Sequence, residues 1–363
     1  MGGGSRALTD LLDQAKARPQ ALDEDARTTL LSLEDPDELA ALFAAARELK
    51  ERYCGRTVAL RGIIEAGNVC VKDCRYCGIR RSNANLERYT LTADDIVRLA
   101  RLDARLGYAS LVIQSGEIEG ETHTAFIEDV LRRIAPLDLG VTLSLGEQTE
   151  ETYRRWRQAG AVRYLLRIET SNPDLYARIH PADHDWNRRV ACLAALRRCD
   201  YQVGTGVMCG LPGQTIRDLA RDIGFFAEID ADMIGMGPFI PHPDTPLGDE
   251  PMDAKRRLSL GLRMIAVTRL HLHDVNIAAA TALQALAPDG REQGVRAGAN
   301  VVMPNITDTK FRRSYQLYAH KPCLDENAAL CRGCLERRLQ AIGETIAYGQ
   351  RGDSLHYRTR AKK

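Results

Sequence analysis

The sequence predicts an α/β fold: a complete (β/α)₈ barrel of the TIM type, with an N-terminal helical extension and a short C-terminal cysteine-containing segment. From residue 57 onward, β-branched apolar runs alternate with helical stretches as long as βα units require. Eight runs are present, and eight parallel strands close such a barrel. The runs are 58–64, 110–114, 140–145, 163–169, 203–209, 233–238, 276–281 and 299–303.

The composition fits one large domain. A chain of 363 residues with 44% hydrophobic content can bury a large core, and the barrel region contains no Pro/Gly/Ser linker. We expect a helical extension at 1–56, the barrel at 57–345 with a cysteine segment at 323–334, and a tail at 346–363. The basic residues at its very end are expected to be solvated.

Local signals support the predicted helices. Short amphipathic helices are expected at 8–17, 25–33 and 37–52, the last with Asp35 as N-cap and Pro36 at its first position. This extension is expected to pack on one side of the barrel. Within the barrel, Thr92 with Asp95 and Asn172 are expected to cap helices.

Charge and hydropathy exclude several partner classes. A formal net charge of +1 with no long basic run gives no reason to expect nucleic acid or an anionic membrane as partner. The longest uncharged apolar stretch, 275–288, is too short to span a bilayer, and the N-terminus lacks the apolar core of a signal peptide. We expect a cytoplasmic protein, whose ten cysteines serve as ligands or buried groups rather than disulfides.

The most informative segment is a CxxxCxxC motif formed by Cys70, Cys74 and Cys77 after the first predicted strand. Three thiolates on a cubane 4Fe-4S cluster leave one iron without a protein ligand, and an open iron can bind a substrate or cofactor. Tyr76 and Gly78 make the pattern more specific than a lone CxxC. The alternative is a zinc knuckle that takes a distant fourth ligand.

The predicted strands end in polar residues far more often than chance would give. In barrels of this type the active site lies at the carboxyl ends of the strands. We therefore expect these segments to surround one mouth together with the cysteine loop. They are 114–117, 144–147, 167–170, 209–215, 239–244, 281 and 303–305.

These strings together resemble radical S-adenosylmethionine (radical SAM) enzymes. Within that superfamily they resemble the HydE-type FeFe-hydrogenase maturases, from the group that contains biotin synthase and methylornithine synthase. The matching strings are 70–80, 143–147, 164–170, 210–215, 237–246 and 298–305. The resemblance covers roughly residues 50–340. It implies a closed barrel cavity, a 4Fe-4S cluster, and SAM that is cleaved reductively to a 5′-deoxyadenosyl radical.

The resemblance assigns Cys70, Cys74 and Cys77 as catalytic cluster ligands. The Ser115-Gly116-Glu117 turn can present carbonyl oxygens to the amino group of SAM, Glu169 can accept from its ribose, and Arg188 matches its carboxylate in a bidentate fork. Glu169 pairing with Arg167 remains the structural alternative. The cofactor-binding residues are Tyr76, Gln114, Ser115, Gly116, Glu117, Glu169, Arg188, Tyr315 and Leu317.

Thr142, Ser144, Arg167 and Thr281 match the lining of the substrate cavity, where an arginine with hydroxyls suits an anionic substrate. The resemblance implies a role in assembling the di-iron subcluster of FeFe-hydrogenase. The expected partners are a small-molecule or organometallic substrate supplied by the maturase HydG, other hydrogenase maturases in transient contact, and a one-electron reductant. Two alternatives stay open: a mutase like methylornithine synthase, and a non-catalytic iron-sulfur scaffold.

A second cysteine triad, Cys323, Cys331 and Cys334, has Cx₇CxxC spacing. The same triad occurs in a subset of HydE proteins as the site of an auxiliary cluster, 2Fe-2S or 4Fe-4S. His320 lies three residues before Cys323, so a four-ligand zinc site is an alternative, as is an empty surface site. The other four cysteines have no ligand-like spacing.

Overall fold

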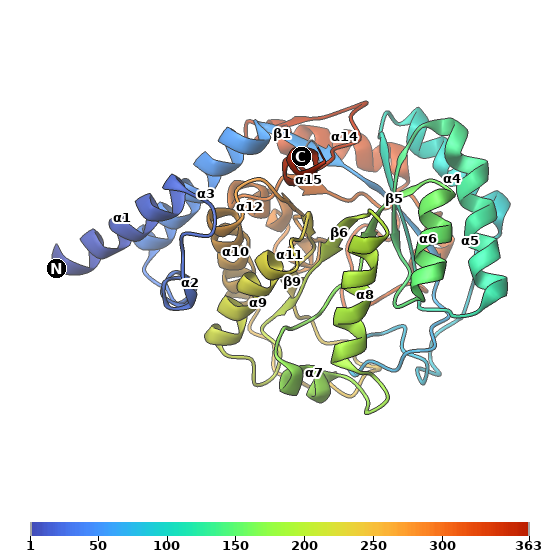
Figure 1. Ribbon diagram of the computed structural model, residues 1–363, viewed down its shortest axis with the longest axis horizontal. Helices are drawn as coiled ribbons and strands as arrows, with labels where there is room; N and C mark the ends of the chain where they lie inside the picture. Colours follow the sequence, from blue (N-terminus) through green and yellow to red (C-terminus); the bar gives the residue numbers. More distant parts are fainter. Residues whose placement is uncertain (1, 362–363) are drawn as a thin grey trace.

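A curved parallel sheet forms the centre of the computed structural model, which describes residues 2–361, and helices cover its outside (Figure 1). Seven strands pair in parallel along this sheet. In spatial order they are β10 (Asn276–Ile277), β8 (Met233–Ile234), β6 (Gln202–Thr205), β5 (Ala161–Leu165), β4 (Gly140–Ser144), β3 (Ser110–Ser115) and β2 (Gly62–Gly67). Their carboxyl ends therefore meet at one face of the molecule.

A smaller sheet lies between the two edges of the large one. It consists of β11 (Val301–Val302), β1 (Thr57–Leu60) and β12 (Thr345–Ile346), and β1 continues into β2 after Arg61. Single bridges from Ala278 to Val301 and from Ile63 to Asn305 join it to both edges. The predicted TIM-type α/β fold is confirmed, but the eighth strand meets its neighbours through short pairings rather than a continuous ladder.

Each predicted run contains a strand, although most strands are shorter than the run. Besides the first run, which contains β1 and β2, two further runs are interrupted. In these, β6 is followed by β7 (Met208–Cys209) and β8 by β9 (Gly237–Pro238), and β7 pairs with β9. The interruption falls where the chains approach closely, since a Cβ on Gly206 would lie 2.0 Å from the oxygen of Gly235. The outer parts of both strands thus lean away from the main sheet.

The helices between the strands begin at the predicted caps. Thr92 and Asp95 form a capping box, and Asn172 accepts hydrogen bonds from the N–H groups of Asp174 and Leu175. None of the described helices is long and apolar enough to cross a membrane. The helices are α4 (Ala93–Arg105), α5 (Glu121–Ile134), α6 (Glu150–Gln158), α7 (Pro173–Ile179), α8 (Trp186–Arg198), α9 (Ile216–Glu228), α10 (Ala254–His271), α11 (Thr281–Leu286), α12 (Gly290–Arg296), α13 (Thr309–Arg312) and α14 (Ala328–Gln340), with a 3₁₀ turn at Ala135–Leu137.

The N-terminal extension packs on one side of the barrel. Its helices are α1 (Gly2–Ala17), α2 (Glu24–Leu31) and α3 (Pro36–Cys54), and Asp35 caps α3 as predicted. Helix α3 lies against α10, and α2 against α9 (Figure 1). The buried guanidinium of Arg27 donates to the carbonyl oxygen of Ala220 at 2.9 Å, which fixes α2 on α9.

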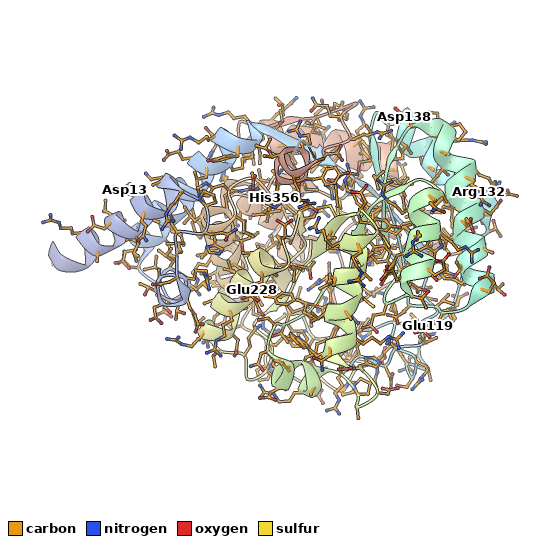
Figure 2. All side chains as sticks on the ribbon, viewed as in Figure 1. Asp13, Glu119, Arg132, Asp138, Glu228 and His356 are labelled. Carbon is orange, nitrogen blue, oxygen red and sulfur yellow. The ribbon has the colours of Figure 1, made fainter. Side chains whose placement is uncertain are left out.

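The segment that the sequence analysis treated as a tail at 346–363 packs against the barrel. Of the basic end at 358–363 that was expected to be solvated, Arg358 is exposed and Arg360 is partly buried, while residues 362–363 lie outside the described part of the chain. Asp353 pairs with the buried guanidinium of Arg163, and α15 (Leu355–Arg360) follows it. His356 lies 2.6 Å from a carboxylate oxygen of Asp230, and Arg360 lies 2.6 Å from its other oxygen (Figure 2 labels His356). A buried arginine needs a counter-charge. Asp353 in the C-terminal segment supplies this counter-charge to Arg163, and the segment thereby covers the amino-terminal end of the strands.

Candidate functional site

The three thiols of the CxxxCxxC motif lie on the loop that follows β2. Asn68 and Arg88 shape this loop: the Asn68 amide donates to the carbonyl oxygen of Ser314 at 2.6 Å, and Arg88 donates to that of Asn68 at 2.6 Å. Cys70, Cys74 and Cys77 keep some accessible surface, yet surrounding protein displaces most of the water around their thiols. They therefore line a recess rather than the outer surface.

The thiols are close enough to influence one another electrostatically. Burial, together with the neighbouring Cys70, raises the pKa of Cys74 to about 12, although Arg189 opposes the shift. Burial, with Cys74 and Cys70 beside it, raises the pKa of Cys77 well above its ordinary value. Thiols with raised pKa values are protonated in the absence of metal. Metal binding therefore releases these protons, and the positive charge of the metal then neutralises the thiolates.

The surroundings of the thiols fit an iron-sulfur cluster. The N–H group of Glu117 donates to the sulfur of Cys70 at 3.3 Å, a contact that stabilises a thiolate. A Cβ on Gly116 would lie 2.7 Å from the Cβ of Cys70 and 2.2 Å from the oxygen of Val69, so only glycine permits this approach. Three thiols on one loop, with a backbone donor and a glycine contact, can hold a cluster with three protein ligands.

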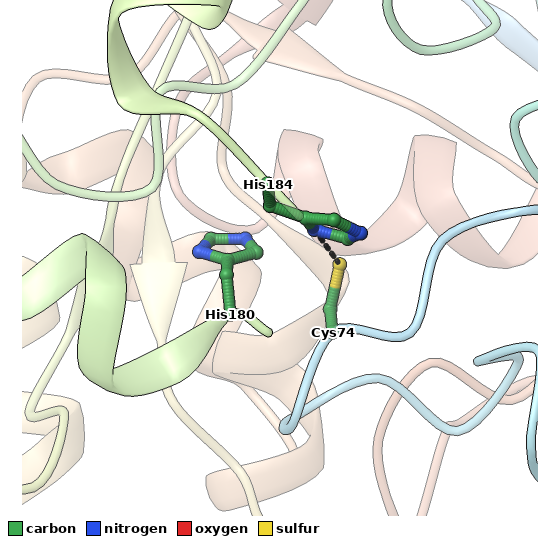
Figure 3. A group of neighbouring side chains, drawn as sticks. All are labelled: Cys74, His180 and His184. Atoms are coloured by element: carbon green, nitrogen blue, oxygen red, sulfur yellow. Dashed lines mark hydrogen bonds between the residues drawn. The ribbon is translucent and has the colours of Figure 1, made fainter. Parts of the chain in front are cut away.

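Two histidines that the sequence analysis missed stand beside Cys74 (Figure 3). The ligand atoms of Cys74, His180 and His184 all lie within 4.8 Å of one another, and Nδ1 of His184 is 3.9 Å from the sulfur. His180 donates from Nδ1 to the oxygen of Tyr176 at 3.0 Å. Burial lowers the pKa of His184 to about 4 and that of His180 well below its ordinary value. Both imidazoles are thus neutral walls of the thiol recess.

Tyr76 faces these histidines. Its hydroxyl lies 3.3 Å from Nε2 of His180, and the two rings meet edge to face at 5.4 Å. The predicted cofactor-binding residue Tyr76 therefore belongs to the wall of the recess, with its polar tip on His180.

The Ser115-Gly116-Glu117 turn packs directly on the cysteine loop. Ser115 donates its hydroxyl to the oxygen of Gly116 at 2.6 Å, and the N–H group of Val71 donates to the oxygen of Glu117 at 2.9 Å. Each of these carbonyl oxygens has a second lone pair available. The turn can still accept from an amino group, as predicted.

Glu169 and Arg167 lie together at the end of β5. Nη2 of Arg167 is 2.9 Å from Oε2 of Glu169, which is the pairing that the sequence analysis kept as an alternative. The Arg167 atoms Nε and Nη2 are buried without a hydrogen-bond partner of good geometry. Glu169 has a φ of +67°, a strained value for a side chain with a Cβ. Arg167 is one-third exposed and Glu169 is buried. A partly accessible guanidinium with buried donor atoms, beside a strained backbone, is typical of a ligand site.

The two neighbouring arginines of α8 have different environments. The predicted Arg188 is half-exposed and lies 2.7 Å from Glu119 and 3.3 Å from Glu147. Arg189, which the sequence analysis missed, is buried and lies 2.5 Å from Glu147. It also donates to the carbonyl oxygen of Arg167 at 2.7 Å. Arg189 is thus part of the floor of the site, while Arg188 remains accessible.

The segment from 315 to 317 closes the other side of the cysteine loop. The N–H group of Gly78 donates to the oxygen of Leu317 at 3.0 Å, and a Cβ on Gly78 would lie 2.1 Å from the oxygen of Gln316. Tyr315 is buried, and its hydroxyl hydrogen-bonds the side chain of Gln114 at the end of β3. Gln114, Tyr315 and Leu317 are therefore brought to the recess.

A cavity inside the barrel contains only one of the four predicted substrate residues. Thr142 lines it, and its hydroxyl is buried without a partner. Ser144, Arg167 and Thr281 do not line it but lie at or beyond the carboxyl ends of β4, β5 and β10. The lining residues are Arg61, Val112, Thr142, Leu165, Met233, Ile234, Gly235, Asn276, Ala278, Val301 and Met303.

The second cysteine triad does converge. Cys323, Cys331 and Cys334 line one pocket beside α12 and α14. The described residues that line this pocket do not include His320, which the zinc alternative offers as fourth ligand. The other lining residues are Gln284, Arg291, Glu292, Glu326, Leu335 and Arg338.

Sequence comparison identifies relatives of known activity. Residues 64–226 match the model of the radical SAM superfamily. The chain is 46% identical over 313 residues to the FeFe hydrogenase maturase subunit HydE of Thermotoga maritima, which covers 86% of this chain and 88% of that protein. It is 30% identical over 285 residues to the 3-methylornithine synthase of Methanosarcina barkeri, covering 78% and 79%.

Structural comparison supports the fold. Methylornithine synthase (PylB) superposes with a TM-score of 0.79 at 24% identity, covering 93% of this chain and 97% of that one. The FeFe-hydrogenase maturase HydG from Carboxydothermus hydrogenoformans superposes with a TM-score of 0.81 at 18% identity, covering 98% and 82%. The chain is thus similar in sequence to a HydE maturase and to a 3-methylornithine synthase, and similar in fold to PylB and HydG.

Proposed function

Since the chain belongs to the HydE family of FeFe-hydrogenase maturases within the radical SAM superfamily, we propose that it is a radical SAM enzyme acting in assembly of the di-iron subcluster of FeFe-hydrogenase. The observation that carries this proposal is the placement of three thiols on one loop at the carboxyl ends of the strands, close enough together for Cys70 and Cys74 to raise the pKa of Cys77. Such a site leaves one iron of a 4Fe-4S cluster for a non-protein ligand.

Cys70, Cys74 and Cys77 would hold the cluster. With SAM bound, a reduced 4Fe-4S cluster supplies a 5′-deoxyadenosyl radical. The protein's share is to bind, to orient and to exclude water. The recess walls formed by Tyr76 and His180 keep water from the thiols.

The residues around the recess match the polar groups of SAM. The carbonyl oxygens of the Ser115-Gly116-Glu117 turn suit its ammonium group. Glu169 suits the ribose hydroxyls, and Arg188 suits the carboxylate because a guanidinium binds a carboxylate through two parallel hydrogen bonds. In this proposal Glu169 exchanges its contact with Arg167 for the ribose, which frees the guanidinium of Arg167 for substrate.

The substrate is a small molecule, and we propose that it is anionic or organometallic. The support is chemical: Nε of Arg167 is buried without a hydrogen-bond partner among the described residues, and so is the hydroxyl of Thr142 inside the barrel cavity. The chain would receive its substrate by transient contact with other hydrogenase maturases and electrons from a one-electron reductant. Ten free cysteines fit a reducing compartment such as the cytoplasm.

We also propose that Cys323, Cys331 and Cys334 hold an auxiliary iron-sulfur cluster. The pocket is lined by two arginines and two carboxylates, and Arg338 pairs with Glu292. Arg291 faces the triad, with Nη2 4.0 Å from the sulfur of Cys323, and its positive charge suits a thiolate there. This cluster would be accessory, since its pocket is lined by helices outside the strand ends.

The proposal is tested by anaerobic reconstitution with iron and sulfide, reduction with dithionite, and assay for 5′-deoxyadenosine. Formation of this product is expected only with both SAM and reductant present. A scaffold that only carries a cluster would give none. A methylornithine synthase activity, the runner-up supported by the 30% identical relative, would instead yield 3-methylornithine.

A further inference from the structure

One carboxylate at the mouth of the barrel is surrounded by three cations. Glu147 follows β4 and is only 1% exposed. Its Oε2 atom lies 3.1 Å from Nζ of Lys72 and 3.3 Å from Nε of Arg188, and its Oε1 atom lies 2.5 Å from Nε of Arg189. One positive charge is enough to neutralise a buried carboxylate. The presence of three cationic side chains around Glu147 therefore indicates that it does more than neutralise one of them.

The cations come from two different parts of the site. Lys72 belongs to the cysteine loop, between Cys70 and Cys74, and also lies 3.3 Å from Glu117. Arg188 and Arg189 begin α8 on the opposite side. The N–H group of Glu147 donates to Oε2 of Glu117 at 2.9 Å, which joins the ends of β3 and β4. Glu147 therefore contacts both the cysteine loop and α8.

The charges of the buried groups balance without Arg188. Lys72 and Arg189 neutralise Glu117 and Glu147, and all four side chains are buried. Arg188 is the additional cation. It is half-exposed, its Nε atom faces Glu147, and its other partner is the equally exposed Glu119. An exposed ion pair of this kind is weak and exchangeable. Arg188 can thus give up Glu119 for another carboxylate while Glu147 keeps holding its Nε edge.

We propose that Glu147 is a positioning residue for SAM: it holds Arg188 at the recess and ties that arginine, through Lys72, to the loop that carries the cluster. The proposal rests on the proposed function, in which Arg188 binds the carboxylate of SAM. It makes SAM affinity depend on a residue that contacts neither SAM nor the cluster. The loop that holds the cluster and the side chain of Arg188 are then both held by the same buried residue, Glu147.

The test compares Glu147→Gln with Glu119→Gln in the reconstituted, reduced enzyme. Glu147→Gln is expected to keep its iron content and the EPR signal of the reduced cluster, because the three thiolates are intact. Its affinity for SAM, read from the SAM-induced change of that signal, is expected to fall by about tenfold or more, as loss of a charge-assisted hydrogen bond predicts. Glu119→Gln is expected to bind SAM within about twofold of the wild type, because its pair is exposed.

A second variant separates positioning from folding. Glu147→Gln leaves Arg189 buried without a carboxylate, whereas the double variant Glu147→Gln/Arg189→Gln restores charge balance and is expected to fold while still binding SAM weakly. Wild-type SAM affinity in the double variant would overturn the proposal, and so would an equal loss in Glu119→Gln. Absence of any SAM-induced change in the wild type itself would instead overturn the proposed function, and this inference with it.

Discussion

The two cysteine triads of this chain differ in how much of the fold holds them. Cys70, Cys74 and Cys77 lie on one loop that contacts the ends of β3 and β4, α7 and the 315–317 segment. Cys323, Cys331 and Cys334 instead lie on α14 and the loop before it, with side chains of α11 and α12 as neighbours. The first triad is therefore shaped by the strand ends and the second by peripheral helices.

The polar groups around the two triads differ as well. Beside the first triad, Lys72 lies between two buried carboxylates, and Gly116 and Gly78 allow backbone to approach the loop. Beside the second, Arg338 pairs with Glu292 at 2.6 Å, and Arg291 lines the pocket. A site that catalyses must be held rigidly by its neighbours, whereas a site that stores or relays electrons has less need of this. The difference predicts a central role for the first triad and an accessory role for the second.

Substitution of Cys70 is the most direct test of the difference between the two triads. Cys70→Ser removes one of the three ligands of the first cluster. Loss of a group that only supports a metal ligand costs about 10- to 100-fold in activity, so loss of a ligand itself is expected to lower 5′-deoxyadenosine formation by more than about 100-fold. Iron bound by the second triad should remain. Cys54→Ser, which changes a partly exposed thiol with no ligand spacing, is the matched control. Undiminished turnover in Cys70→Ser would contradict the assignment.

Glu169 tests whether the first triad has a SAM site beside it. Glu169→Gln keeps the shape of the side chain but removes its charge, and loss of charge-assisted hydrogen bonds worth about 1.5–3 kcal/mol should weaken SAM binding by about 10- to 100-fold. Iron content should not change. Binding is measured by equilibrium dialysis of the reconstituted protein, with Glu121→Gln on the outer face of α5 as control. Equal affinities in the two variants would show that Glu169 only pairs with Arg167.

The second triad is tested by the double variant Cys331→Ser/Cys334→Ser. The iron content of this variant should fall. Because the pocket of the second triad is separate from the first, 5′-deoxyadenosine formation should stay within about threefold of the wild type, which corresponds to a change of less than about 1 kcal/mol in activation free energy. Mössbauer spectra before and after the substitution identify the lost iron. A collapse of turnover to zero would contradict an accessory role and place both triads in one catalytic unit.

The C-terminal segment supplies a control for both triads. Pairing with Asp274 and Asp230 raises the pKa of His356 to about 9. The folded state thus binds this proton more tightly than the unfolded chain, so its contribution is complete below the ordinary pKa of about 6.5 and is lost as the pH rises through about 9.

His356→Gln is therefore expected to lower the free energy of unfolding by about 1–2 kcal/mol at pH 6 and by much less at pH 10, with allowance for partial exposure of the pair. Urea unfolding at the two pH values measures this. Iron content at neither triad should change. A pH-independent loss would mean that His356 acts by packing rather than by charge.

The sequence was sufficient for the elements and for the thiols. Apolar runs placed a strand in each of eight segments, and Thr92 and Asn172 cap helices as their residue types predict. Cys70, Cys74 and Cys77 lie within one short segment of the sequence, so their position on a single loop could be predicted from their spacing alone. These features depend on residues that are near one another in the chain.

The features that the sequence did not reveal depend on long-range packing. Arg188 and Arg189 are adjacent in sequence, yet only Arg189 is buried, because one residue along a helix rotates the side chain by about 100° and the barrel selects the inward face. His180 and His184 follow α7, and only tertiary structure brings them to Cys74. Likewise, Asp353 pairs with Arg163, which lies 190 residues earlier in the chain, and no local sequence signal reveals that contact.

The central claim is that the first triad holds a cluster with one iron open to SAM. EPR of the anaerobically reconstituted, dithionite-reduced enzyme, recorded with and without SAM, tests it most directly, with Cys331→Ser/Cys334→Ser as the sample so that only the first cluster contributes. We predict a 4Fe-4S signal whose g values change on addition of SAM. A signal that is identical with and without SAM would contradict the account.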